Sequence, residues 1–69
     1  MPEYVVNRKA QNSGDHQVHV DTCSRVPDEE NREPLGFHTR CRSAVIAARV
    51  MGFASVNGCR WCSPECHLR

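Results

Sequence analysis

The sequence lacks any apolar run that could cross a membrane, and it lacks a marked excess of one charge. A membrane-spanning helix needs about 20 consecutive apolar residues, and no stretch of the 69-residue chain approaches that length. The formal net charge is only +1, whereas nucleic-acid-binding domains typically carry a strongly basic face. The composition therefore excludes a transmembrane helix and gives no global charge signal for a nucleic-acid partner.

Aromatic side chains are also scarce. The chain has one Trp, one Tyr and two Phe residues. A domain of this size buries only about 60% of the surface that its unfolded chain exposes, so its core alone is marginal. Bound zinc can contribute on the order of 10 kcal/mol to the folding of such a domain. We therefore expect residues 1–69 to form a single domain that depends on a crosslink.

The chain has five cysteines, an odd number, and no apolar run after Met1 that could act as a signal peptide. Disulfide frameworks normally use an even number of cysteines, in chains that enter an oxidising compartment. The cysteines therefore favour a metal site, and we expect a cytoplasmic protein. A thiol redox protein or a disulfide-stapled protein is the alternative.

The C-terminal segment carries a Cys-x2-Cys pair, formed by Cys59 and Cys62. A tight turn, helped by Gly58, can bring two such sulfurs to one edge of a tetrahedron around zinc. The same spacing occurs in thioredoxin-like redox pairs, but no βαβ pattern surrounds it here. We therefore interpret the pair as half of a zinc site.

The other half of the site is expected from His19 and Cys23, which are four residues apart at the end of a predicted strand. Thiolate and imidazole are donors that zinc prefers, and four protein ligands would leave no open position for catalysis. The alternatives are that His19 is an ordinary solvent-facing histidine and that Cys66 or His67 supplies a ligand instead. The predicted ligands of a structural zinc ion are His19, Cys23, Cys59 and Cys62.

Three further residues near these ligands have simpler interpretations. Cys41 lies on the apolar face of the predicted helix, where a cysteine is by default a buried small hydrophobic residue. Cys66 is expected to be a spare thiol. Trp61, between two predicted ligands, is expected to pack over the metal site rather than stack on a base.

Alternating apolar residues predict three short strands. In the second of them, His19 is expected to point away from the valine face, and in the third, Leu35 and Phe37 are expected to turn inward. The polar segment Pro27–Pro34 is predicted to be an exposed loop. The predicted strands are Glu3–Asn7, His16–Val20 and Leu35–Thr39, and the first two are expected to pair as a hairpin.

A helix is predicted from Arg40 to Met51, where the apolar residues recur at intervals of three and four. Thr39 is a candidate N-cap, Gly52 suits a left-handed residue at the helix end, and Ser63 can start a short C-terminal turn of helix. We therefore predict an α+β fold. It is a small zinc-stabilised domain with a short antiparallel sheet of about three strands on one main helix, a Cys-x2-Cys knuckle and a C-terminal helical turn.

The solvent face of the predicted helix carries Arg42 and Arg49 beside Ile46 and Val50. Exposed aliphatic residues next to arginines can form a partner surface, although a partly covered helix flank has the same pattern. The candidate contact residues for a partner or for nucleic acid are Arg40, Arg42, Arg49 and Arg60.

The order of motifs from about Val18 to Cys62 resembles the N-terminal metal-binding domain of the Ada DNA-repair protein and its small relatives. The shared features are Val-His-x3-Cys at His19, a variable loop, Leu35-Gly36-Phe37, a helix that starts near Cys41, then Gly52-Phe53 and Cys-x2-Cys. The resemblance implies a small zinc-binding sheet flanked by helices. Cys59, the first cysteine of the knuckle, comes six positions after Phe53, and this gap is longer than is usual in that family.

One departure from the family bears on function. In the Ada-type domain, a zinc-bound cysteine of the first pair accepts a methyl group from a DNA phosphotriester, but His19 stands at that position here. An imidazole bound to zinc is not a nucleophile, so we expect the fold and the zinc without the methyl transfer.

The sequence therefore favours a non-catalytic zinc-binding module that binds a macromolecular partner. A protein partner is preferred to nucleic acid, and we infer neither a membrane partner nor a small-molecule substrate. The alternatives are an Ada-like DNA-binding or methyl-acceptor domain that uses Cys23 or Cys59, and the redox or disulfide-stapled protein considered above.

Overall fold

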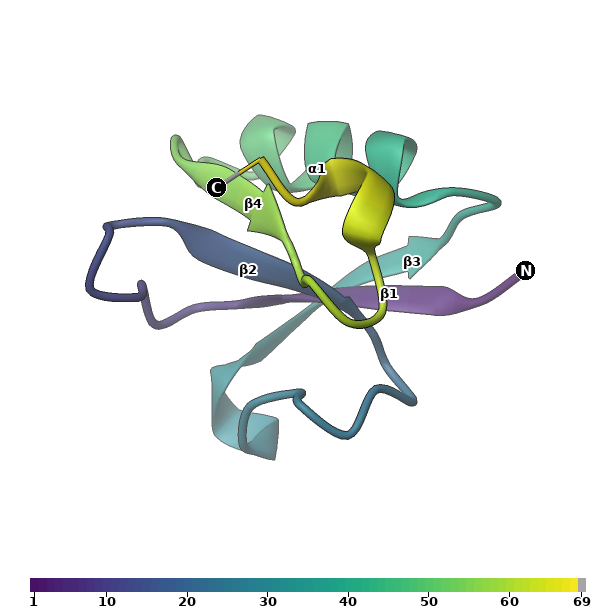
Figure 1. The fold of residues 1–69 in the computed structure, drawn as a ribbon, viewed down its shortest axis with the longest axis horizontal. Coiled ribbons are helices and arrows are strands. Elements are labelled where there is room, and N and C mark those ends of the chain that lie inside the picture. Colours follow the sequence, from purple (N-terminus) through teal and green to yellow (C-terminus); the bar gives the residue numbers. More distant parts are fainter. Residues whose placement is uncertain (69) are drawn as a thin grey trace.

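The computed structural model describes residues 1–68 and shows a small α+β fold, in which one helix lies across one face of a sheet (Figure 1). In the described chain, no helix is long and apolar enough to span a membrane. The strands are β1 (Glu3–Asn7), β2 (His16–Val20), β3 (Arg32–Phe37) and β4 (Val56–Gly58), the helix is α1 (Cys41–Val50), and the short 3-10 turns are η1 (Glu29–Asn31) and η2 (Pro64–Cys66).

The sheet has four strands in the order β3-β1-β2-β4, one more than the sequence predicted. β1 pairs antiparallel with β2, as expected for the hairpin, and with β3 on its other side. β4 pairs parallel with β2, so the sheet is mixed rather than antiparallel. The three residues of β4 include an Asn and a Gly, which are uncommon in strands, so local propensity gave no sign of this element.

Buried polar contacts fix the start of β4. The side chain of Asp15 is 1% exposed and accepts hydrogen bonds from the hydroxyls of Ser13 and Ser55. The backbone N–H of His16 also donates to the carbonyl of Ser55 at 2.8 Å. Asp15 was not predicted to have a structural role. Through Ser55, it links the β1–β2 turn to the segment that enters β4.

The two faces of the β1–β2 hairpin have different roles. Tyr4, Val6 and Val18 point to the helix and join the core, whereas Val5 and His19 are paired across the hairpin and share the opposite face. The buried residues of the core are Tyr4, Val6, Val18, Leu35, Cys41, Ala44, Ala48 and Val56. This alternation was predicted correctly, and it removes His19 from the apolar core.

α1 ends close to its predicted bounds, but it starts differently. Arg40 rather than Thr39 occupies the N-cap position, with extended backbone angles and no side-chain capping hydrogen bond. The Thr39 hydroxyl instead contacts the Met1 sulfur at 3.3 Å. Gly52 follows the helix with a φ of +111°, the positive value expected of a glycine that ends a helix.

β3 begins three residues earlier than predicted, inside the segment that was expected to be a loop. Its pairing with β1 skips Leu35, because Tyr4 faces Gly36 and the next pair involves Pro34. This bulge, with Gly36 at a φ of +86°, breaks the alternation on which the inward orientation of Phe37 was predicted. Leu35 is buried, but Phe37 is 63% exposed. Pro34 is tolerated because β3 is an edge strand.

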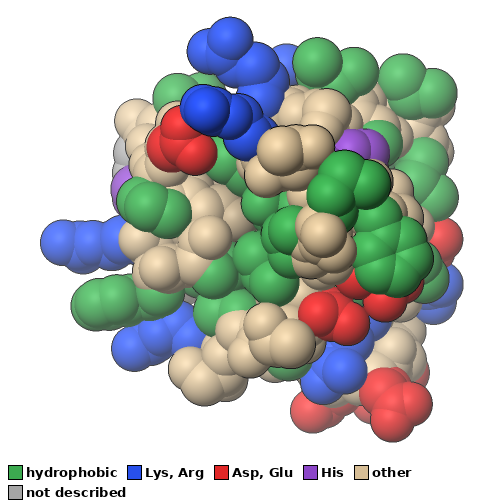
Figure 2. All heavy atoms as spheres, turned by 90° about the vertical axis from the view of Figure 1, so that its right-hand side faces the viewer, with side chains coloured by type: hydrophobic (Ala, Val, Ile, Leu, Met, Phe, Trp, Pro, Cys, Tyr) green, Lys and Arg blue, Asp and Glu red, His purple; other side chains and the backbone are tan. Residues whose placement is uncertain are grey.

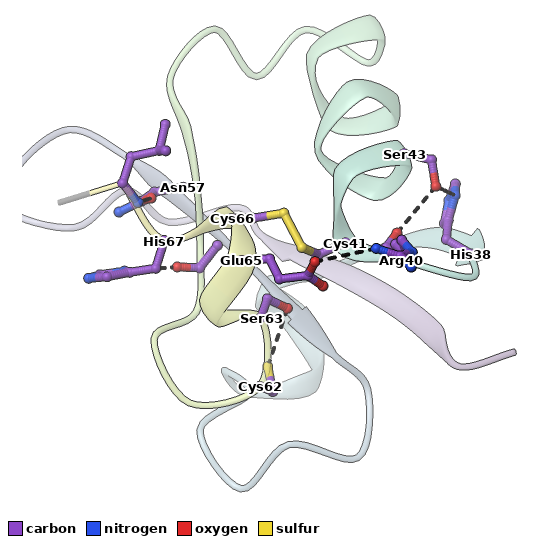
Figure 3. The surroundings of a disulfide bond; sticks show 12 residues. His38, Arg40, Cys41, Ser43, Asn57, Cys62, Ser63, Glu65, Cys66 and His67 are labelled. Carbon is purple, nitrogen blue, oxygen red and sulfur yellow. Dashed lines mark hydrogen bonds and ion pairs between the residues drawn. A yellow bond between two sulfur atoms is a disulfide. The ribbon is translucent and has the colours of Figure 1, made fainter.

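A disulfide joins Cys41, the first residue of α1, to Cys66 in η2 (Figure 3). The expectation of an isolated buried Cys41 and a spare Cys66 thiol is therefore wrong. The parity argument against disulfides failed because three of the five cysteines belong to a separate cluster, which leaves an even pair. The disulfide spans 25 positions, and closing a loop of that length stabilises a fold by about 3 to 4 kcal/mol.

We predict that the double variant Cys41→Ala/Cys66→Ala folds but loses about 3 kcal/mol of unfolding free energy, because its unfolded chain is no longer constrained. Urea denaturation followed by circular dichroism measures this loss. The wild-type protein in a reductant that leaves bound metal in place should show the same loss. An unchanged denaturation midpoint in both experiments would show that the two thiols are not joined.

Candidate metal centre

Four side chains from three segments meet beside the end of β2. His19 lies on β2, Cys23 in the turn that follows, and Cys59 and Cys62 in the loop after β4. Their ligand atoms all lie within 4.8 Å of one another. His19 and Cys59 are each 1% exposed, and the other two are half-buried. The structure thus brings together the four residues that the spacing singled out.

The hairpin and its turn position the first pair of residues. His19 is held opposite Val5 by the β1–β2 register, and the N–H of Asp21 donates to the Glu3 carbonyl at 2.9 Å. The N–H of Cys23 then donates to the Val20 carbonyl at 3.0 Å. The chain therefore turns back on itself, and the thiol of Cys23 returns to the side of His19.

The parallel pairing of β4 with β2 positions the second pair. Gly58 lies opposite Val18, and the N–H of Cys59 continues the ladder by donating to the Val18 carbonyl at 2.9 Å. The knuckle is closed by the N–H of Ser63, which donates to the Cys59 carbonyl at 2.8 Å. Cys59 therefore follows directly on the strand that neighbours His19.

Gly58 is required by a close approach of the chain rather than by its backbone angles. A Cβ atom added there would lie 2.6 Å from the Cβ of Cys66 and 2.7 Å from the carbonyl oxygen of Ser63. Such distances are well inside van der Waals contact, so a larger side chain would push η2 off the knuckle. From the sequence, Gly58 was expected to help the chain turn between the two cysteines. In the structure, the glycine is needed because η2 packs directly against it.

Backbone amides point at the sulfur atoms. The N–H of Trp61 donates to Cys59 Sγ at 3.4 Å, and the N–H of Val20 donates to Cys62 Sγ at 3.3 Å. The hydroxyl of Ser63 lies 3.7 Å from Cys62 Sγ (Figure 3). Donors of this kind favour the thiolate over the thiol, and metal binding requires the thiolate.

The pKa values of Cys59 and Cys62 are shifted in opposite directions. Burial tends to raise the pKa of Cys59, but N–H donation from Cys62 and Trp61 brings it below its ordinary value. Burial raises the pKa of Cys62 to about 12, with a further rise from Cys23. Cys59 and Cys62 therefore do not both ionise readily unless a cation supplies the compensating charge.

His19 also suits a ligand role, because its imidazole is buried. Burial lowers the pKa of its imidazole, so the ring is neutral at pH 7 and keeps a lone pair for a metal. Its Nδ1 lies 3.9 Å from Cys62 Sγ. Metal–sulfur and metal–nitrogen bonds of about 2.3 Å and 2.0 Å imply donor separations of roughly 3.5 to 3.8 Å in a tetrahedron. The donors, all within 4.8 Å of one another, would have to move closer by up to about 1 Å to surround a four-coordinate ion.

The alternative ligands lie outside the cluster. Cys66 is in the disulfide, and Nδ1 of His67 lies 3.1 Å from the carbonyl oxygen of Gly58, an acceptor to which it donates (Figure 3). Trp61 does not pack over the site as predicted, because 62% of its surface is exposed. The tight turn between Cys59 and Cys62 directs the intervening side chains outward.

Three of the four arginines proposed as contact residues are neighbours. Arg42 and Arg49 line the same groove along α1, and Arg40 lines an adjoining hollow with Arg42 and forms an ion pair with Glu65 at 3.6 Å (Figure 3). Arg60 lies on the knuckle with Trp61. Basic and acidic side chains are also interspersed on the face in Figure 2, as the low net charge indicated.

Comparisons with family models, with curated proteins and with solved structures find no match to this chain. The similarity to the Ada-type domain therefore rests on the motifs of the sequence.

We predict that His19→Ala and Cys23→Ser each weaken zinc binding by more than roughly 100-fold. Mutation of a residue that only hydrogen-bonds to a metal ligand typically costs roughly 10- to 100-fold, and here a ligand itself is removed. Each change opens the tetrahedral shell. Competition with a chromophoric chelator measures the affinity. His67→Ala is the matched control, because this imidazole lies outside the cluster.

Carbon-13 shifts of the cysteine β-carbons give an independent check of the same assignment. Cys23, Cys59 and Cys62 should show metal-thiolate values, and Cys41 and Cys66 should show disulfide values. A free-thiol shift at Cys23 in the zinc-loaded protein would contradict the ligand set.

Proposed function

We propose that this protein is a non-catalytic, zinc-stabilised module that binds a macromolecular partner, and that the partner is a protein. The observation that carries the proposal is the arrangement of three thiols and one imidazole within 4.8 Å of one another. A Cys3His set is characteristic of structural zinc sites, and four protein ligands leave no position for substrate or water. Zinc is thus favoured over metals that prefer oxygen ligands.

The position of the cluster supports a structural role. It ties β2 and its turn to the knuckle, on the face of the sheet opposite the core, while the disulfide ties the knuckle's continuation to α1. A chain of this size gains little from its core alone. The metal and the disulfide therefore hold the C-terminal segment in place from two sides.

The partner surface that we propose is the outer side of α1. Ile46 and Val50 are 54% and 82% exposed, and Arg42 and Arg49 line a groove of about 330 Å³ beside Ile46. This combination suits an apolar segment that carries acidic residues. Glu65 also lines the groove, but it is paired with Arg40, so Arg42 and Arg49 remain the charges that an acidic segment can neutralise.

The alternative functions have less support. In the Ada-type reaction the nucleophile would be a thiolate at the position of His19, which this chain does not offer. Thiol exchange at the Cys-x2-Cys pair would need access to Cys59, the cysteine whose pKa is lowered, but Cys59 is 1% exposed. The disulfide of the chain joins Cys41 to Cys66 instead.

The test of the metal's role is zinc removal. Native mass spectrometry of the untagged protein should give a mass increased by one zinc ion and reduced by the two hydrogens of one disulfide. An excess of a strong chelator should then abolish the cooperative thermal transition, because metal binding free energy contributes to folding. A protein that keeps its amide protection in excess chelator would refute the structural role.

The test of the partner face uses a synthetic helical peptide with alternating acidic and aliphatic positions as a probe. Its addition should shift the amide resonances of Ile46 and Val50, and each of Ile46→Ser, Arg42→Glu and Arg49→Glu should weaken binding about tenfold or more. Arg8→Glu is the matched charge control, since Arg8 pairs with Glu33 away from α1. Equal losses in the control would show that only net charge matters.

A further inference from the structure

The metal knuckle presents a large aromatic side chain to solvent. Trp61, the only tryptophan of the chain, is 62% exposed. The Cζ atoms of Arg25 and Arg60 lie 4.5 Å and 5.7 Å from its ring centroid. Within the described chain neither arginine forms an ion pair. The indole belongs neither to the clustered ligands nor to the core. Its contacts with the two guanidinium groups still leave most of its surface open to solvent.

The same three side chains border a hollow of about 530 Å³. Its remaining walls come from the β1–β2 turn, from β2 and from the residue after η2, namely Gln11, Gln17 and His67. The lining therefore combines one open aromatic ring, guanidinium groups, amides and an imidazole. None of the described residues that line it is acidic.

We infer that this hollow binds single-stranded nucleic acid. A base exposed on a single strand can stack on the indole of Trp61, and the strand's phosphates can accept hydrogen bonds from Arg25 and Arg60. The amides of Gln11 and Gln17 can donate to base edges and accept from them. A duplex keeps its base faces stacked inside the helix, so its bases cannot use the ring in this way.

The metal cluster organises this site, which rests in that respect on the proposed zinc-stabilised module. Arg60 and Trp61 stand between two of the clustered cysteines, and Arg25 follows Cys23 by two residues. The site is distinct from the groove along α1, because the two share no lining residue, and they adjoin only at the C-terminal segment, where Cys66 and Leu68 line the groove and His67 lines the hollow. The module would thus hold a single strand and a protein segment on separate surfaces.

The low net charge sets the expected strength of binding. With two arginines at the site, the logarithm of the affinity should fall with the logarithm of salt concentration with a slope of only about −1.4, since each neutralised phosphate of a single strand contributes roughly −0.7. Stacking on Trp61 should therefore carry a substantial share of the affinity at physiological salt.

The test uses the zinc-loaded protein and the intrinsic fluorescence of its single tryptophan. Titration with oligothymidylate or oligouridylate should quench Trp61, because a stacked base quenches indole emission. With a labelled oligonucleotide and anisotropy as the readout, Trp61→Ala should weaken binding roughly 10- to 100-fold. Arg25→Ala should weaken it about tenfold, whereas Arg8→Ala, the matched control at the ion pair with Glu33, should leave it unchanged.

Several outcomes would overturn the inference. These are the absence of quenching at low salt, equal losses for Arg25→Ala and Arg8→Ala, or tighter binding of duplex DNA than of either single strand. Binding of a mononucleotide as tight as that of the oligonucleotide would identify a free nucleotide as the ligand. Stronger quenching by the acidic peptide probe would identify a protein.

Zinc content and thermal transition, measured for each variant, separate this inference from the proposed function. A Trp61→Ala variant that loses zinc is replaced by Trp61→Leu, which keeps an apolar side chain but has no ring for a base to stack on. Normal zinc content without oligonucleotide binding would refute the nucleic-acid site alone. Loss of one-to-one zinc binding in the wild type would refute the metal-stabilised module instead.

Discussion

The parallel contact between β2 and β4 is the constraint on which the rest of this fold depends. The contact is only three residues long, but a further hydrogen bond from the N–H of Cys59 to the Val18 carbonyl extends it. This hydrogen bond brings the knuckle beside His19. Parallel pairs need a long crossover connection, and here that crossover includes β3 and α1. The helix is therefore fixed on one face of the sheet by the same connection that brings the knuckle to the other.

Two kinds of sulfur chemistry then divide the cysteines of a small chain. The buried Cys41 lies in the apolar core, where a disulfide adds no charge and needs no hydrogen-bond partner. Near His19, burial opposes ionisation, but N–H donors bring the pKa of Cys59 below its ordinary value while that of Cys62 is raised to about 12. A cation would allow both to be thiolates. The spacing in the sequence identifies this set, whereas Cys41 and Cys66 meet through the packing of η2 against α1.

The sequence predicted what short-range patterns control and missed what depends on distant contacts. The hairpin and α1 follow from periodicity, and the four clustered residues follow from the spacing of His19 with Cys23 and of Cys59 with Cys62. β4, the bulge at Leu35 and the disulfide depend on pairings between segments far apart in the chain. Phe37 was misplaced because one extra residue in an edge strand reverses the orientation of every side chain after it.

The geometry of the knuckle links stability to recognition. When Cys59 and Cys62 both turn toward the cluster, the two residues between them must point to solvent, so the surface formed by Arg60 and Trp61 exists only while the turn is closed. The groove along α1 depends instead on η2, which the disulfide holds against the helix. The disulfide therefore maintains the groove, whereas the surface of Arg60 and Trp61 depends on the closed turn between Cys59 and Cys62, which the proposed metal would hold.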